Sequence, residues 1–306
     1  MAVNGLLRQG DHVLATSLEH NATARPLELL RKNGVIELDW IPCAADGRLD
    51  PEIIRKLIKK NTRLLVMTHA SNVLGTILPV RECFKIAHEY GVLTLLDAAQ
   101  TAGALPITMA GDECDIVAFA GHKGLGGLAG TGGLALGKNA ATLMRPWISG
   151  GTGSVSHSLD MPECLPDRFE PGTQNTIGIL SLAASVEEIL HAGVEKIREH
   201  EQALTARFLN GLQTIKNIRV AGALDPALSM PVVSVVNHDP AEVSRRLFDD
   251  HGIITRSGLH CSPLAHKTAG TFPAGTVRFS FGRGTTEAEI DAIVQALETS
   301  GQIPAP

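Results

Sequence analysis

The chain contains the run Val92-Leu93-Thr94-Leu95-Leu96-Asp97, in which an almost wholly apolar segment ends in a carboxylate. A strand that is apolar throughout, without alternation, is typical of a parallel sheet covered on both faces. Similar runs lie at 64–68 and 116–119, and helical patterns such as 80–90 separate them. The sequence therefore predicts an α/β fold with a mostly parallel sheet. Ligands of such sheets bind at the carboxyl ends of the strands, where Asp97 stands.

The rest of the chain extends this pattern and then changes it. Further strands are expected at 12–16, 35–41, 134–136, 231–236, 253–256 and 277–281. Helices are expected around 27–32, after Asp50-Pro51-Glu52, over roughly 179–215, after Asp239, and after Thr286, which has capping-box spacing to Glu289. Residues 150–175 are rich in Gly, Ser and Pro and predict long loops. We expect a large domain over residues 1–205 and a smaller C-terminal α+β domain over residues 206–306.

Composition excludes several classes of protein. The 306 residues carry a net charge of −5, which argues against a nucleic-acid binder, and a hydrophobic content of 44% that suits a globular chain. No apolar run approaches the ~18 residues that span a bilayer. The N-terminus is too weakly apolar for a signal peptide, so a cytoplasmic protein is expected. Five cysteines without a CxxC pair disfavour a disulfide framework and a zinc site.

Lys123 follows the predicted strand 116–119 and precedes a glycine-dense segment, 124–133. A lysine at such a junction can place its amine in a cleft where the backbone approaches a ligand closely. An acid at the exit of one strand and a lysine beyond a later strand are what a pyridoxal phosphate enzyme needs. The lysine binds the cofactor covalently, and the acid keeps the pyridine nitrogen protonated. We therefore expect pyridoxal 5'-phosphate as the cofactor.

Two glycine patterns nearby suggest nucleotide binding but lack its other requirements. The segment 124–129 matches a loose dinucleotide fingerprint, yet it follows a His-Lys pair and has no acid about 20 residues further on. The segment 132–138 has Walker A spacing, but Asn139 replaces the residue that would hold magnesium, and its interior predicts a strand. Nucleotide binding is not expected.

Seven motifs occur together along the chain. They are Ser17–Asn21, His69–Thr76, Asp97–Gln100, Gly121–Lys123, Arg168–Thr173, Arg256–Cys261 and Arg278–Gly282. With these motifs in this order, nearly the whole chain resembles the class V aminotransferase-type pyridoxal phosphate enzymes, and within them the cysteine desulfurase and selenocysteine lyase branch. The resemblance implies the fold type I of these transferases and a homodimer.

The resemblance also implies roles for the residues around the cofactor. Lys123 would hold it and move protons, and His20 would stack on its ring. Asp97 would pair with the pyridine nitrogen and Gln100 with the phenolic oxygen, while His122 would help to bind the phosphate. Taken singly, His20 would be a polar surface histidine and Gln100 an ordinary surface residue. Their company with Lys123 favours the cofactor roles.

Substrate binding and sulfur chemistry are implied at four further positions. Asn72 and Arg278 match the groups that hold the substrate carboxylate, because a guanidinium can grip a carboxylate bidentately. Arg256 would line the same pocket. Cys261 matches the nucleophile that takes sulfur from L-cysteine as a persulfide and leaves L-alanine, and a sulfur-acceptor protein would follow. The alternative for Cys261 is a buried structural cysteine, although its neighbours do not make a core environment.

The chain departs from the family pattern in two ways. Ala120 stands where a serine often contacts the phosphate. The family's first strand–helix unit, with a threonine-containing glycine turn on the phosphate, is expected to be missing. Thr152, after Gly151, is a candidate to replace it from a partner subunit. The residues leave open a related lyase or transaminase acting on selenocysteine, cysteine sulfinate or another amino acid, and a catalytically impaired, truncated member of the family.

Overall fold

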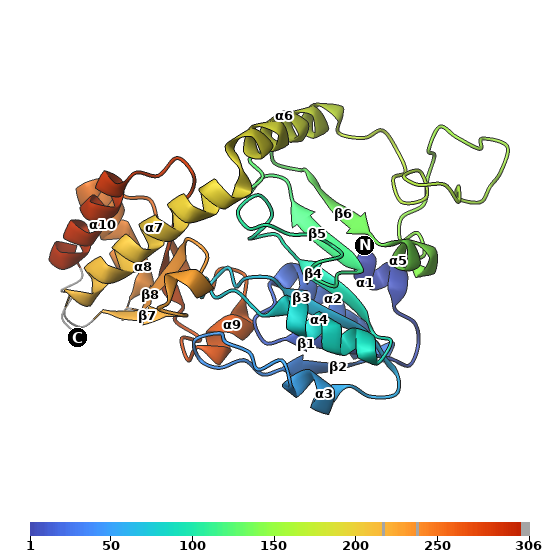
Figure 1. Cartoon of the computed structure of the whole chain (residues 1–306), viewed down its shortest axis with the longest axis horizontal. Coiled ribbons are helices and arrows are strands. Elements are labelled where there is room, and N and C mark those ends of the chain that lie inside the picture. The colour runs from blue at the N-terminus through green and yellow to red at the C-terminus, as the bar shows by residue number, and fades with distance from the viewer. Residues whose placement is uncertain (216–217, 237–238, 301–306) are drawn as a thin grey trace.

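The structure is a computed structural model and describes residues 1–215, 218–236 and 239–300. Its first sheet comprises β1 (Asp11–Thr16), β2 (Ile36–Ile41), β3 (Thr62–Thr68), β4 (Leu93–Asp97), β5 (Ile116–Ala120) and β6 (Gly132–Leu136). The second sheet comprises β7 (Arg219–Ala221), β8 (Val232–Val236), β9 (Arg256–Gly258) and β10 (Thr276–Ser280). The helices are α1 (Ala2–Leu6), α2 (Asn21–Lys32), α3 (Ile53–Leu57), α4 (Val80–Glu89), α5 (Lys138–Leu143), α6 (Thr176–Ala192), α7 (Val194–Gln213), α8 (Pro240–His251), α9 (Pro263–Thr268) and α10 (Glu287–Ser300). Figure 1 shows the second sheet in a separate lobe, into which α7 leads.

The six-stranded sheet has the order β2-β1-β3-β4-β5-β6. Its strands pair in parallel except for β6, which runs antiparallel to β5. Thr68 lies beside Asp97, and Asp97 beside Ala118, so three strands end at the same edge. The expected α/β fold with a mostly parallel sheet is confirmed. The second sheet, β7-β8-β10-β9, is antiparallel, as an α+β unit requires.

The apolar strands of the first sheet are covered on both faces. Leu65 of β3 is fully buried in a cluster with Phe84 of α4, whereas its neighbour Leu64 is fully buried in a second cluster with Leu27 of α2. Successive strand residues point to opposite faces, which explains why an uninterrupted apolar run is needed here. A third cluster around Phe208 of α7 and Phe279 of β10 forms the core of the smaller lobe.

The structure corrects three sequence predictions. The single helix expected over 179–215 is two helices, α6 and α7, which meet at Gly193 with a bend of 80°. Gly193 has a φ of +85°, a conformation that favours glycine, so the helix breaks although the apolar pattern continues. The strand expected at 253–256 begins only at Arg256. The helix expected directly after Asp50 begins at Ile53 and has five residues.

The predicted domain boundary after residue 205 falls within α7 and stays a proposal. Within the described residues, no single helix is long and apolar enough to cross a membrane. The pair α6 and α7 passes that test together by length and composition only, across its 80° bend.

Candidate active site

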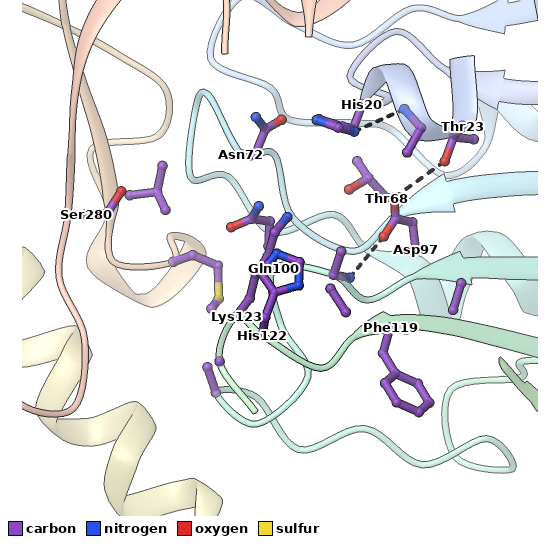
Figure 2. A pocket seen from close by; sticks show the side chains of 18 of the residues that line it. His20, Thr23, Thr68, Asn72, Asp97, Gln100, Phe119, His122, Lys123 and Ser280 are labelled. Carbon is purple, nitrogen blue, oxygen red and sulfur yellow. Dashed lines mark hydrogen bonds between the residues drawn. The ribbon is translucent and has the colours of Figure 1, made fainter. Parts of the chain in front are cut away.

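A cavity of about 840 Å³ opens at the carboxyl edge of the first sheet and is also lined by residues of the second lobe. Eight of the ten predicted site residues line it: His20, Asn72, Asp97, Gln100, His122, Lys123, Arg256 and Arg278. Figure 2 shows the first six of them around one space, reached from separate segments of the chain. Cys261 and Thr152 are the two predicted residues outside the lining.

Asp97, the last residue of β4, is held by hydrogen bonds to both carboxylate oxygens. Its Oδ1 accepts from the backbone amide of Ala99 at 2.9 Å. Its Oδ2 accepts from the hydroxyl of Thr23, in the first turn of α2, at 3.4 Å (Figure 2). These contacts fix the orientation of a negative charge at the wall of the cavity. The sequence analysis did not identify Thr23. Its position three residues after His20 is the feature that could have indicated it.

His20 immediately precedes α2 and caps its N-terminus. Its Nδ1 accepts from the amide of Ala22 at 3.0 Å, so the proton of the neutral imidazole sits on Nε2. Burial lowers the pKa of His20, and the positive charge of Lys123 lowers it further. The ring therefore stays neutral at physiological pH, a state suited to flat contact with another ring and to proton relay at Nε2.

Lys123 lies in the turn after β5, where its side chain points into the cavity (Figure 2). Burial lowers the pKa of its ammonium group, the nearby Asp97 carboxylate opposes this, and Arg278 adds to the lowering. A lowered pKa increases the fraction of free amine, which is the nucleophilic form. Gly124, the residue after Lys123, leaves no room for a side chain, because a Cβ there would lie 2.6 Å from the carbonyl oxygen of Ala102.

Arg278 lies on β10, a central strand between β8 and β9, and not on a sheet edge. Its Nη1 donates to the carbonyl of Asn72 at 3.2 Å. Its Nε is buried and has no hydrogen-bond partner within the part of the chain that the structure describes. A buried guanidinium donor without a partner is costly unless an anion reaches it, so this arrangement suits a carboxylate ligand in the cavity.

Cys261 is exposed and lies in the loop between β9 and α9. Its Sγ is 3.4 Å from Nη2 of Arg256, which does line the cavity. The thiol therefore stands beside a cationic cavity residue. Of the other cysteines, Cys83 and Cys114 are buried and Cys43 is half-buried, which leaves Cys164 as the second exposed thiol.

Thr152 belongs to the long segment between α5 and α6, which projects from the molecule in Figure 1. Its hydroxyl contacts the hydroxyl and carbonyl of Ser154. The structure of the single chain does not bring it to the cavity, and its role from a partner subunit stays a proposal.

Glu19 is a functional-site neighbour to which sequence reasoning gave no role. It is fully buried, and its Oε1 accepts from the Thr16 hydroxyl at 2.6 Å and the Thr68 amide at 2.7 Å. Burial raises the pKa of Glu19 to about 8, and the charge of Asp97 adds to the rise. Glu19 thus stays protonated at neutral pH.

Glu19→Gln is expected to change how stability depends on pH. The folded chain keeps the Glu19 proton up to about pH 8, while in the unfolded chain the pKa of Glu19 is near its ordinary value of 4.5. Raising the pH across this window therefore lowers the free energy of unfolding of the wild type. Glutamine mimics the protonated acid and cannot ionise, so the variant should gain up to roughly 4 kcal/mol over the wild type as pH rises to about 8. Urea unfolding of both proteins at about pH 5 and pH 8 measures this change. An equal loss of unfolding free energy in the two proteins between these pH values would contradict it.

Known proteins resemble this chain in sequence and in fold. Residues 1–293 match the family model of aminotransferase class-V. A protein of Methanothermobacter thermautotrophicus named "Probable cysteine desulfurase" is 33% identical over 294 residues, which cover 95% of this chain and 73% of that protein. A cysteine desulfurase of Escherichia coli O7:K1 is 34% identical over 300 residues, covering 96% of this chain and 72% of that protein. The apo structure of a cysteine desulfurase from Thermococcus onnurineus NA1 superposes with a TM-score of 0.90 at 31% identity, over 97% of this chain and 76% of that one.

Proposed function

The chain belongs to the aminotransferase class-V family, in its cysteine desulfurase branch, and we therefore propose that it is a pyridoxal 5'-phosphate-dependent cysteine desulfurase. The observation that supports the proposal most strongly is that Lys123 and Asp97 line the same cavity. Arg256 also lines this cavity, and its guanidinium contacts the thiol of Cys261. The reaction would convert L-cysteine to L-alanine and leave the sulfur on Cys261 as a persulfide.

The residues present fit the cofactor. The cavity offers an amine of lowered pKa, a fixed carboxylate, a neutral imidazole ring and a guanidinium nitrogen that no described residue pairs with. When bound, pyridoxal phosphate supplies an electron sink for the substrate carbon. Lys123 would hold it covalently, and the carboxylate of Asp97 would keep its pyridine nitrogen protonated. Further contacts would come from His20 against the ring, Gln100, His122, and Thr152 of a second copy.

The substrate would be oriented by its carboxylate. Arg278 would give its free Nε and a second nitrogen to the two oxygens, with Asn72 and Arg256 beside it. The amine of Lys123, once free, would take and return protons at the substrate carbon. The Cys261 thiolate would attack the substrate sulfur, so that a sulfur–sulfur bond forms and the carbon–sulfur bond breaks. The electron pair of the broken bond stays with the carbon, which takes a proton and becomes the methyl group of the departing alanine. An acceptor protein would then remove the outer sulfur of the persulfide.

The proposal is tested by incubating the purified chain with L-cysteine and a thiol reductant, with and without added pyridoxal phosphate. We expect alanine and sulfide in equal amounts, and a dependence on the cofactor. Cysteine sulfinate and selenocysteine, offered in parallel, distinguish the desulfurase from a related lyase. No alanine from L-cysteine, with turnover of another amino acid, would replace the proposed substrate.

Arg278→Lys is expected to weaken substrate binding more than chemistry. Lysine keeps the positive charge but loses the planar fork that holds a carboxylate with two bonds. We expect kcat/KM for L-cysteine to fall about 10- to 100-fold, mainly through KM, as the loss of a charge-assisted hydrogen bond predicts. Steady-state alanine formation measures this. The matched control is Arg245→Lys, an exposed arginine paired with Glu242 on α8. Equal effects of the two changes would contradict the assignment.

A homodimer is also proposed, on the basis of apolar side chains that the single chain leaves exposed. On α6, Ile177 and Leu180 lie on one face, three residues apart, and are 77% and 65% exposed. Trp147 and Leu159 of the neighbouring long segment are exposed as well. Burying such side chains stabilises an interface by roughly 1.5–3 kcal/mol each. Sedimentation velocity should therefore give a dimer, and Leu180→Glu should shift it toward monomer; a wild-type monomer at high concentration would exclude the proposal.

A further inference from the structure

The loop that carries Cys261 has an unusual backbone. His260 and Cys261 have φ angles of +49° and +60°, in a region that side chains other than glycine rarely adopt. Two consecutive residues in this conformation cost free energy, and such strain persists only where surrounding contacts offset it. Contacts from elsewhere in the chain must therefore hold this loop in place.

Asn72 supplies two of these contacts, one on either side of Cys261. Its Nδ2 donates to the carbonyl of His260 at 2.8 Å, and its Oδ1 accepts from the hydroxyl of Ser262 at 2.6 Å. The side chains of all three residues are buried, so water does not compete for these bonds. The backbone amide of Asn21 donates a further hydrogen bond of 2.9 Å to the carbonyl of Cys261 itself.

Asn72 is well suited to hold another segment because its own backbone is fixed. It lies in a turn in which the amide of Gly75 donates to the carbonyl of Ser71, and the Ser71 hydroxyl accepts from the amides of Val73 and Leu74. Gly75 has a φ of +70°, and a Cβ there would lie 2.2 Å from the carbonyl oxygen of Val232, so the turn is locked against β8. The carbonyl of Asn72 accepts from Arg278.

We propose that Asn72 is a positioning residue that clamps the Cys261 loop, in addition to facing the substrate. This rests on the proposed function, which makes Cys261 the nucleophile. An amide group has two N–H donors, and within the described chain only the bond to His260 uses Nδ2. The second donor is left for a ligand in the cavity that Asn72 lines. The side-chain amide of Asn72 would thus bind the substrate carboxylate and also hold the loop that positions the Cys261 thiol.

The clamp is tested by amide hydrogen exchange of the purified protein without substrate. Peptides carrying the amides of Asn21 and Ser262 report on the loop, because both amides are hydrogen-bonded within it. Asn72→Ala and Ser262→Ala should each speed their exchange about tenfold, the order expected for loss of a buried hydrogen bond. Asn72→Asp is a second variant, which keeps the acceptor for Ser262 but replaces the donor to His260 with an oxygen, and it should speed the exchange as well.

The matched control is Ser229→Ala, which removes a buried hydroxyl that donates to the carbonyl of Ala223, away from the loop. It should leave the exchange of both peptides unchanged. Ser262 does not line the cavity, so Ser262→Ala should lower kcat for alanine formation about tenfold with KM within about twofold. Melting temperatures of the variants distinguish a local effect on the Cys261 loop from a general loss of stability.

The proposal is overturned if Asn72→Ala raises KM while loop exchange stays at the wild-type rate, or if Ser262→Ala behaves like Ser229→Ala. Either result would make Asn72 a substrate ligand alone. Failure of the proposed function would look different. A wild-type protein that forms no alanine from L-cysteine would remove the desulfurase, whereas the exchange rates would still report whether Asn72 holds the loop.

Discussion

Lys123→Ala is expected to remove both the visible absorbance of bound pyridoxal phosphate and the conversion of L-cysteine. Lys123 lines the cavity, and burial lowers the pKa of its ammonium group, which increases the fraction of the nucleophilic free amine. In the proposed function Lys123 both anchors the cofactor and acts as the base at the substrate carbon, so the variant would lack both groups. Loss of a residue with both roles should cost on the order of 10⁴-fold or more in kcat.

Absorbance spectra and alanine formation, recorded after addition of pyridoxal phosphate, check this expectation. Lys138→Ala is the matched control, because Lys138 is an exposed lysine at the start of α5 and does not line the cavity. It should retain the wild-type spectrum. A visible band in Lys123→Ala that equals the wild-type band would contradict the assignment of the anchor.

Cys261→Ser should separate cofactor binding from sulfur transfer. The variant is expected to keep the visible absorbance, since Cys261 does not line the cavity, but to lose alanine formation by on the order of 10³-fold. A serine hydroxyl is a far weaker nucleophile toward sulfur than a thiolate and cannot carry a persulfide.

Cys164→Ser is the control for this change, because Cys164 is the other exposed cysteine. It should form alanine at the wild-type rate. If instead Cys261→Ser formed alanine at an unchanged rate, the chain would act as a lyase or transaminase that needs no thiol, and the desulfurase proposal would fail.

The sheet was predictable because strands buried on both faces need uninterrupted apolar runs. Leu64 and Leu65 serve opposite faces of the sheet, and both must be apolar whatever packs on them. The break at Gly193 was not predicted, because the apolar period continues through it and only the backbone angle of one glycine reveals the bend. Strand β9 was misplaced for a related reason. Its three residues are set by pairing with β10, which no local pattern of the chain encodes.

The site was predictable where residue type alone constrains chemistry, as for Lys123 and Asp97, which the fold brings to one cavity. The contacts that hold these groups were not. The bond between Asn72 and Ser262 joins residues 190 positions apart, and nothing near either residue indicates the other. The burial of Glu19 likewise depends on how Thr16 and Thr68 pack around it in three dimensions.

A single turnover with L-cysteine, in the absence of any reductant or acceptor, tests the central claim most directly. Mass spectrometry of the protein after reaction identifies the peptide that carries the sulfur. The alanine released is measured in the same sample. We predict one alanine per chain and a gain of the mass of one sulfur atom on the peptide that contains Cys261. Alanine release without added mass on that peptide, or no alanine at all from chain loaded with pyridoxal phosphate, would contradict a desulfurase that works through Cys261.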